Sequence, residues 1–392
     1  MTDDVHADVS ALDRCALAAV VGRDIAVNLL WCLPGRVGGS EEYLARQLAG
    51  LGALMPSFLP TLYGPRGYPA AHPDLAARFT IAAGPPDGGL RSLRILGEHS
   101  WLANRTRGAD LVHHGGGTVP AIGTRPTVLT VHDLQYLAHP EYHRALKLRY
   151  LSAAIPRSVQ RADVVTVPTE WVRSTVIEAF GVDPDDVVVV RHGITPPVLA
   201  AGADEPELRE RFGLGDGPVV VLPAITHPHK GHRFLLEVMA RHWVDPDLRL
   251  VLLGGRGTAD ASVEAAIDEF GLRSRVIRPG RVPDADRDGL IALSQALVFP
   301  SEYEGFGAPV VEAMALGTPV ICTDHPALAE VVGPAGLVLP RSLDAWADAL
   351  AEVDRCGPDL VAAGVDRAAR FTSERSGADL ATAYQRALEA AA

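Results

Sequence analysis

Two glutamates and a group of glycines in one short segment are the residues of this sequence best suited to chemistry. Residues 300–321 read P-S-E-Y-E-G-F-G-A-P-V-V-E-A-M-A-L-G-T-P-V-I and follow an apolar run that ends at Phe299. Pro309 is typical of the start of a helix and Gly317 of its end. The segment Ser301–Ala308 is therefore predicted to be a strand-to-helix loop.

This loop predicts an anion site. Gly305 and Gly307 let the backbone approach a ligand, and the amides of Gly307–Val310 would lie at a helix N-terminus, which attracts a diphosphate. Glu304 and Glu312 would flank that anion. Two carboxylates are unfavourable beside phosphate alone, so we expect a ligand that also carries hydroxyls, such as a ribose and a sugar. On the glycines alone, a plain loop with solvated glutamates is the alternative.

Length and composition narrow the class of protein. The 392 residues suffice for two or three domains, and 47% apolar with 21% charged residues is typical of globular chains. Lys plus Arg total 36 against 48 for Asp plus Glu, and the net charge of −12 gives no general attraction to nucleic acid. Four scattered cysteines, an acidic N-terminus and the absence of a bilayer-length apolar stretch predict a soluble, cytoplasmic protein.

Short β-branched runs alternate with segments of helical period, which favours parallel sheets covered on both faces and an α/β fold. Strands are predicted at 25–31, 127–131, 163–167, 187–190, 219–222, 249–253, 275–277, 296–299 and 319–322, with another near Leu111. Helices are predicted at 41–51, 144–160, 169–180, 231–242, 259–271, 284–294 and 309–316. We expect one domain over 1–195, with 1–22 partly disordered, a second over 206–372, and an amphipathic helix over 373–392.

The run Glu304–Gly317 (E-G-F-G-A-P-V-V-E-A-M-A-L-G), with its E-x7-E spacing, resembles the signature of the retaining nucleotide-sugar glycosyltransferases of family 4. The resemblance extends in order from about Val27 to Leu339. It implies the GT-B fold, with two facing Rossmann-like domains and an interdomain cleft. The C-terminal domain would hold a nucleoside-diphosphate sugar and the N-terminal one a hydroxyl acceptor, and the helix 373–392 would cross back to the N-terminal domain.

The resemblance also assigns roles to residues. The donor would be bound by Lys230, Gly305, Phe306, Gly307, Ala308, Pro309, Val310 and Glu312. Within that set, Lys230 would neutralise the phosphates and Glu312 would hold the ribose. Glu304 and His132 are the catalytic candidates: Glu304 would hold sugar hydroxyls, and His132, in T-V-H-D-L, would contact the sugar near the reacting bond. No cofactor and no metal is expected.

Two further segments carry the resemblance. Gly38 and Gly39, in V-G-G-S-E-E, would turn their amides toward the donor diphosphate, with Ser40 as the cap of the next helix; a glycine turn before a capped helix is the alternative. The run H-K-G around Lys230 departs from the commoner pattern, because many relatives have an arginine where this chain has Ile225. His227 or His229 is the expected substitute for that phosphate contact.

Other patterns are weaker. The run H-G-G-G at 114–117 is similar to the oxyanion loop of some hydrolases, but the chain has no G-x-S-x-G elbow, so we expect a glycine-rich loop. His227, His229 and His232 lack further metal ligands nearby, and G-R-G at 255–257 is too short for a dinucleotide fingerprint. The Asp-x-Asp pairs at 183/185, 245/247 and 284/286 lie in loops and are expected to be solvated.

The segment 143–161 has five basic residues, at Arg144, Lys147, Arg149, Arg157 and Arg161. It is predicted to be a helix that either contacts the inner membrane face or is simply solvated. The overall function predicted is hexosyl transfer with retention, by same-side attack, in a bacterium. The alternatives are a nucleotide-sugar epimerase or another non-transferring enzyme of the GT-B fold, and an inactive sugar-nucleotide binding protein. The donor stays open among GDP-mannose and UDP- or dTDP-hexoses.

Overall fold

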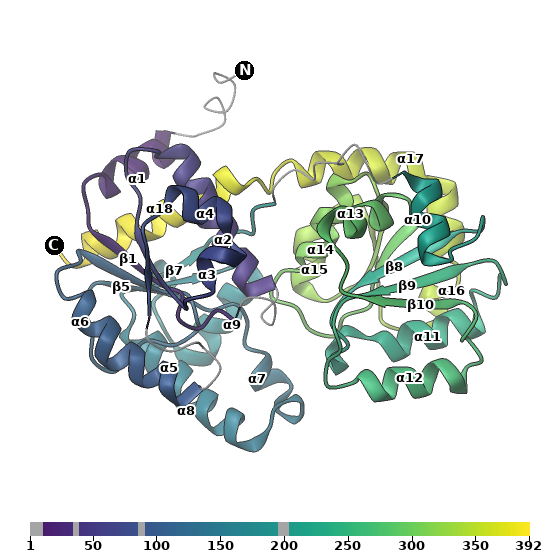
Figure 1. Ribbon diagram of the computed structural model, residues 1–392, viewed down its shortest axis with the longest axis horizontal. Helices are drawn as coiled ribbons and strands as arrows, with labels where there is room; N and C mark the ends of the chain where they lie inside the picture. Colours follow the sequence, from purple (N-terminus) through teal and green to yellow (C-terminus); the bar gives the residue numbers. More distant parts are fainter. Residues whose placement is uncertain (1–10, 34–38, 85–90, 195–203) are drawn as a thin grey trace. The chain divides into compact units, whose positions relative to one another are not determined.

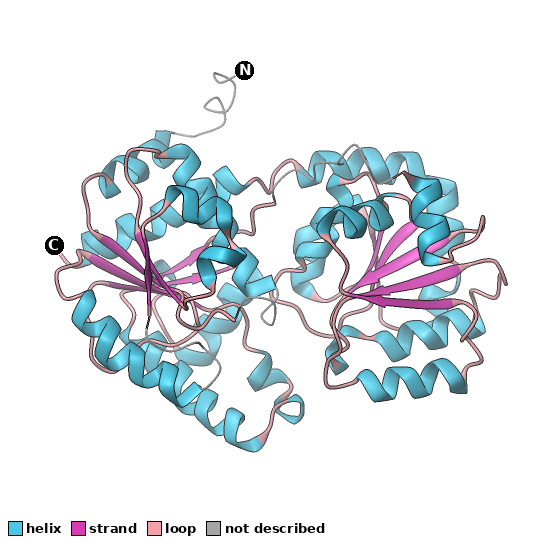
Figure 2. Cartoon of the chain, viewed as in Figure 1, coloured by secondary structure: helices cyan, strands magenta, loops and turns pink. Residues whose placement is uncertain are grey.

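The computed structural model describes residues 11–33, 39–84, 91–194 and 204–392. The chain divides into two compact units, Met1–Thr195 with Phe371–Ala392, and Pro196–Arg370 (Figure 1). In each unit a parallel sheet lies between layers of helices, as Figure 2 shows. The predicted α/β class with two Rossmann-like domains is confirmed.

Within its described residues, the first unit has seven parallel strands in the order β3-β2-β1-β4-β5-β6-β7. They are β1 (Ile25–Asn28), β2 (Thr61–Gly64), β3 (Ile81–Ala83), β4 (Leu111–His114), β5 (Thr127–Thr130), β6 (Val164–Val167) and β7 (Val187–Val189). Every residue of β1, β4, β5 and β6 is buried. These central strands are covered on both faces, which is why they are continuous apolar runs instead of alternating ones.

The helices of the first unit connect these strands and cover both sheet faces. They are α1 (Ala11–Val20), α2 (Gly39–Leu54), α3 (Tyr68–Ala71), α4 (Pro73–Arg78), α5 (Arg91–Gly97), the π-helix η1 (Glu98–Leu102), α6 (Ala103–Arg105), α7 (Gln135–Ala138), η2 (Pro140–Tyr142), α8 (Ala145–Arg161), α9 (Glu170–Phe180), η3 (Pro184–Asp186) and α18 (Ser373–Ala390).

Helix α18 belongs to the first unit although it comes last in the sequence. It packs against α1 and α2, and its Leu380 and Tyr384 are fully buried. The Tyr384 hydroxyl lies 2.9 Å from Nδ1 of His113 on β4. The α2–α18 crossing is tight: a Cβ on Gly50 would lie 1.7 Å from the carbonyl oxygen of Ser373. The C-terminal helix is therefore an integral layer of this unit.

Within residues 1–22, predicted to be partly disordered, Ala11–Val20 forms the helix α1. Its Ala16 and Val20 are buried, and Asp13 pairs with Arg375 of α18 at 3.1 Å. The helix is stabilised by a partner more than 350 residues away, so its own weak periodicity did not predict it. Residues 1–10 lie outside the described part of the chain.

The second unit has six parallel strands among its described residues, in the order β10-β9-β8-β11-β12-β13. They are β8 (Val219–Pro223), β9 (Arg249–Leu253), β10 (Val276–Gly280), β11 (Ala296–Phe299), β12 (Val320–Thr323) and β13 (Leu337–Leu339). The helices are α10 (Glu205–Phe212), η4 (Pro228–Lys230), α11 (His232–Arg241), α12 (Asp260–Glu269), α13 (Asp284–Ala292), α14 (Ala308–Ala315), α15 (Pro326–Val332), η5 (Gly333–Ala335), α16 (Leu343–Ala347) and α17 (Ala349–Ala368).

Candidate active site

The order of strands in the second unit points to a ligand site between β8 and β11. These strands are neighbours, but the chain continues from β8 toward β9 and from β11 toward β12, in opposite directions across the sheet. Open α/β sheets bind ligands at the carboxyl ends of the strands where the order reverses in this way. Lys230 follows β8 and Glu304 follows β11, so both lie at this point.

Gly231 lets the segments after β8 and β11 approach each other. Its φ of +71° lies in the left-handed region, and a Cβ there would lie 2.2 Å from the carbonyl oxygen of Pro300. Next to it, the amide of Glu302 donates to the carbonyl oxygen of His229 at 2.7 Å. No other residue type fits this approach, which explains the glycine after Lys230.

Lys230 and Glu304 form an ion pair. Nζ of Lys230 lies 2.5 Å from Oε1 of Glu304, and the two side chains are 20% and 10% exposed. The ammonium also lies 5.6 Å from the ring centre of Phe299. The residue predicted to bind phosphate, Lys230, is thus in contact with the residue predicted to bind the sugar, Glu304. The sequence did not indicate this contact.

The predicted glycine loop ends at the N-terminus of α14. Gly307 precedes the helix with φ +92° and no side chain caps it, and a Cβ there would lie 2.5 Å from Leu328. The side chains of Phe306 and Val310 are buried in the core, so only their backbone can face a ligand. Within 307–310 the amide of Val310 donates to the carbonyl oxygen of Gly307 at 3.0 Å and Pro309 has no N–H, which leaves the amides of Gly307 and Ala308 for an anion, and binding there stays a prediction.

The remaining predicted donor residues lie around this terminus. Gly305 comes just before Phe306 in the loop, and Ala308 and Pro309 form the first two helical positions, all three half-buried. Pro309 is thus the second residue of α14 and not the first. Because proline has no N–H, the amide of Ala308 is the first one that the helix presents.

Glu312 lies one turn into α14 and interacts electrostatically with Arg287, a residue that no motif in the sequence indicated. Burial acts to lower the pKa of Arg287, but the charges of Glu312, Asp288 and Asp284 outweigh it and raise that pKa. Arg287 also bonds Asp284 at 3.0 Å and Asp288 at 2.8 Å. In the sequence Arg287 lies in the acidic run D-A-D-R-D, a pattern that indicates a solvated loop and gives no sign of a contact with Glu312.

In the first unit, the predicted glycine loop falls only partly within the described residues. Gly38 lies outside them, and α2 begins at Gly39, so Ser40 is inside the helix and is not its cap. Glu41 in the first turn is buried, and its Oε1 lies 2.8 Å from Nε2 of His72. This carboxylate of the first helical turn is thus part of the interior.

His132 follows β5, and its tautomer is fixed by one contact. Nε2 lies 2.9 Å from the carbonyl oxygen of Gly115, which can only accept, so Nε2 carries the proton and Nδ1 offers a lone pair. Burial lowers its pKa, against the opposing effects of the Gly115 bond and Asp133. The rings of Tyr43 and Trp31, centred 5.6 and 5.7 Å away, hold it in place. His132 is a neutral hydrogen-bond acceptor.

The competing motifs have structural explanations. A Cβ on Gly115 would lie 2.1 Å from Leu44 and one on Gly116 2.6 Å from Trp31, so the H-G-G-G run permits close packing. His232 is buried, which lowers its pKa to about 4. The described residues contain no group of three or more His, Cys, Asp or Glu that could hold a metal.

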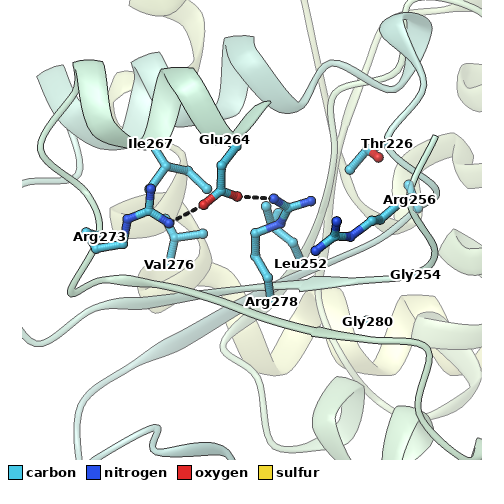
Figure 3. A pocket seen from close by; sticks show the side chains of 11 residues that line it. Thr226, Leu252, Gly254, Arg256, Glu264, Ile267, Arg273, Val276, Arg278 and Gly280 are labelled. Carbon is cyan, nitrogen blue, oxygen red and sulfur yellow. Dashed lines mark hydrogen bonds and ion pairs between the residues drawn. The ribbon is translucent and has the colours of Figure 1, made fainter. Parts of the chain in front are cut away.

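A pocket of about 350 Å³ lies between α12 and strands β9 and β10 (Figure 3). Its apolar lining includes Leu252, Ile267 and Val276. Glu264 lies between Arg273 and Arg278 and pairs with both, as the dashed lines in Figure 3 show. Arg273 also pairs with Asp268 and Arg278 with Asp260, so each arginine has two acidic partners, and none of the predicted site residues lines the pocket.

Two family models match the chain, one in each unit. The model described as "Glycosyltransferase Family 4" matches residues 37–196, and that described as "Glycosyl transferases group 1" matches residues 204–363. The chain belongs to the family 4 glycosyltransferases. The resemblance carried by the E-x7-E run is thereby confirmed, together with the GT-B fold.

Individual relatives share about a third of their residues with this chain, over part of its length. The O-antigen chain mannosyltransferase B of Escherichia coli is 32% identical over 242 residues, 60% of this chain and 63% of that enzyme. The MMP alpha-(1->4)-mannosyltransferase of Mycolicibacterium hassiacum is 32% identical over 175 residues, 44% and 40% of the two chains. The chain thus spans less than two thirds of the length of both relatives.

Among solved structures, HepE of Anabaena in complex with UDP and glucose has a TM-score of 0.71 to this chain. The match covers 92% of this chain and 98% of that one, at 20% sequence identity. At this level of identity the likeness concerns the fold. No helix in the described parts of this chain is both long and apolar enough to cross a bilayer.

Proposed function

We propose that this protein is a retaining, metal-independent glycosyltransferase that moves a hexosyl group from a nucleoside-diphosphate sugar to a hydroxyl acceptor. The observation that carries the proposal is the Lys230–Glu304 pair beside the uncapped N-terminus of α14. A cation and backbone amides suit a diphosphate, and a carboxylate suits sugar hydroxyls. Relatives named as mannosyltransferases favour mannose as the sugar.

In the proposed reaction, the residues stabilise charge and hold the reactants in position. Lys230 and the amides of α14 bind the diphosphate and stabilise it as it leaves. Glu304 binds hydroxyls of the transferred sugar, Glu312 binds the ribose, and the lone pair on Nδ1 of His132 accepts a bond from a sugar hydroxyl. The acceptor attacks from the side that the diphosphate leaves, and the diphosphate takes the acceptor's proton, so the anomeric configuration is retained.

Product analysis tests this function. The purified chain is incubated with GDP-mannose, UDP-glucose and dTDP-glucose, with and without acceptor alcohols, and with EDTA in parallel. Transfer to an acceptor that persists in EDTA, with an unchanged anomeric configuration by NMR, is expected. An altered donor sugar formed without acceptor would instead establish an epimerase, and binding of donor without any turnover an inactive binding protein.

We also propose that α8 brings the protein to an anionic membrane surface. Arg144, Lys147 and Arg149 are exposed near its start, and no acidic residue occurs from Tyr142 to Ala162. Leu146 lies among these cations and is 82% exposed. Cations beside an exposed apolar side chain, in a protein of net charge −12, suit the interface of an anionic bilayer.

A further inference from the structure

Ile225 raises the question of which group balances the second negative charge of a bound diphosphate. The family resemblance leads one to expect an arginine at this position, and isoleucine carries no charge. The charge of Lys230 is partly neutralised by Glu304, whose Oε1 lies 2.5 Å from Nζ. A helix N-terminus contributes only about half an elementary charge. The proposed donor site therefore needs another cation near position 225.

The backbone around Ile225 is in direct contact with the loop after β9. The amide of Thr226 donates to the carbonyl oxygen of Gly255 at 3.3 Å, and the amide of Gly257 donates to Oγ1 of Thr226 at 2.7 Å. A Cβ on Gly254 would lie 2.6 Å from the carbonyl oxygen of Ala224. Gly254 and Gly257 thus permit two loops to pack backbone against backbone, and Ile225 lies in that contact.

Arg281 extends over this contact from the next strand. β10 has an irregularity of register between Ile277 and Gly280, and Gly280 has φ +80°. The amide of Gly254 donates to the carbonyl oxygen of Gly280 at 3.0 Å, which ties the two loops together. Nε of Arg281 lies 3.5 Å from where a Cβ on Gly255 would be. Bulges commonly redirect a side chain next to a functional site.

The charge of Arg281 is available to a ligand. In the described part of the chain, no acidic residue pairs with it, and its side chain is exposed. Its neighbours differ: Arg256 lies 3.7 Å from Asp260, and Arg278 pairs with both Asp260 and Glu264. Among these three arginines at the carboxyl edge of β9 and β10, Arg281 alone has an uncompensated guanidinium.

We propose that Arg281 binds the diphosphate of the donor and supplies, from the loop after β10, the positive charge that Ile225 lacks. This inference rests on the proposed function. Arg281 is thus a donor-binding residue that reaches the phosphates over Gly255, with its Nε at contact distance, 3.5 Å, from where a Cβ on residue 255 would be.

Calorimetry on the full chain tests the proposal. Affinities are measured for UDP or GDP, whichever binds more tightly, and by NMR titration for the matching nucleoside. Arg281→Ala is expected to weaken the diphosphate at least tenfold and the nucleoside less than twofold. Arg256→Ala, on the adjoining loop, is the matched control and should change neither affinity more than twofold. Arg281→Ala combined with Ile225→Arg should recover most of the lost diphosphate affinity.

The other outcomes separate the explanations. Equal losses for diphosphate and nucleoside would overturn the proposal in favour of a contact to the base, and an unchanged affinity would show a solvated arginine. In both cases wild-type binding of the diphosphate would leave the proposed function standing. Failure of the wild-type chain to bind UDP, GDP or dTDP would overturn the proposed function and this inference together.

Discussion

Nζ of Lys230 lies 2.5 Å from Oε1 of Glu304, so a cation suited to phosphate and a carboxylate suited to hydroxyls neutralise each other. A diphosphate that approaches the ammonium competes with Glu304 for it. The carboxylate is then released toward the sugar that the same diphosphate carries. In the proposed reaction the pair would thereby couple recognition of the leaving diphosphate to recognition of the transferred sugar.

Lys230→Ala should reduce turnover more than tenfold while changing the stability of the fold much less. Loss of the ammonium from a pair whose side chains are only 20% and 10% exposed costs about 1–3 kcal/mol, which leaves the chain folded at 25 °C, whereas loss of the charge-assisted phosphate contact acts on turnover. Initial rates and thermal midpoints measure the two effects. Arg233→Ala, which breaks the exposed pair between Arg233 of α11 and Glu269 of α12, is the control and should leave turnover unchanged. A thermal loss that accounts for the whole loss of activity would indicate a structural lysine.

Glu312→Ala should weaken binding of the nucleoside diphosphate by about 1–3 kcal/mol, the cost of losing bonds to a charged group. Calorimetry with the ribo and 2′-deoxy forms of the same nucleotide gives the sharper test. Wild type should prefer the ribo form, and the variant should lose that preference because the carboxylate that binds the ribose is gone. A preference that survives the substitution would remove Glu312 from the ribose site.

Gly231→Ala should destabilise the protein and abolish binding of nucleoside diphosphates, because a Cβ would meet Pro300 at 2.2 Å and separate Lys230 from Glu304. Gly213→Ala is the control that measures the cost of a left-handed backbone without a steric clash. Its φ is +65°, and nothing lies within 4 Å of the added Cβ. The control should cost about 1–2 kcal/mol, the price of a left-handed alanine, with binding intact. Denaturant unfolding and calorimetry check both, and equal behaviour would refute the steric argument.

Buried histidines should make the protein less stable as the pH falls below about 6.5. Burial lowers the pKa of His113 and of His114 to about 3, and that of His232 to about 4. The unfolded chain therefore binds more protons than the folded one below the ordinary histidine pKa. The contribution of these histidines to the free energy of unfolding is fully present above pH 6.5. It is lost toward pH 3–4, by roughly 1.4 kcal/mol per pH unit for each group.

Denaturant unfolding between pH 7 and pH 5 measures this slope, before most carboxylates titrate. His232→Gln removes one of the groups and should reduce the slope by up to about 1.4 kcal/mol per unit. A slope that stays the same in the variant would mean that His232 titrates normally in the folded chain.

Vesicle sedimentation tests the role of α8. Leu146→Ser with Arg149→Glu should reduce binding to vesicles rich in anionic lipid about tenfold or more, since each cation near the surface contributes about 1 kcal/mol. Val244→Ser removes a comparably exposed apolar side chain from the second unit, 66% exposed, and should have no effect. Equal binding of all three proteins, or equal binding to neutral vesicles, would show that α8 is only solvated.

Features encoded locally were predictable from the sequence. The strand β11, the loop to Gly307 and helix α14 follow from an apolar run, two glycines and a proline, all within 20 residues. The strands β2, β3 and β13 were missed because each has only three or four residues and at least part of each is half-exposed, at or near a sheet edge. Such runs lack the continuous burial that marks the central strands.

Contacts between distant segments were not predictable. Lys230 and Glu304 are 74 residues apart, and their pairing depends on a close backbone approach at Gly231 that no pattern in the sequence announces. Likewise Arg287 reads as one charge in an acidic run until α13 and α14 are packed together. The sequence thus indicated which residues belong to the site. Their contacts with one another could be identified only from the folded structure.

The place of α18 in the first unit has a consequence for biosynthesis. A ribosome must translate residues 196–370 before it reaches the helix that covers α1 and α2, an interval of roughly 10 to 35 seconds. Throughout that interval the first sheet lacks a layer, and the second unit has its whole sequence once residue 370 is added, before α18 is made. Maturation of the nascent polypeptide therefore runs against the direction of its synthesis, with the half that emerges earlier reaching its native state later.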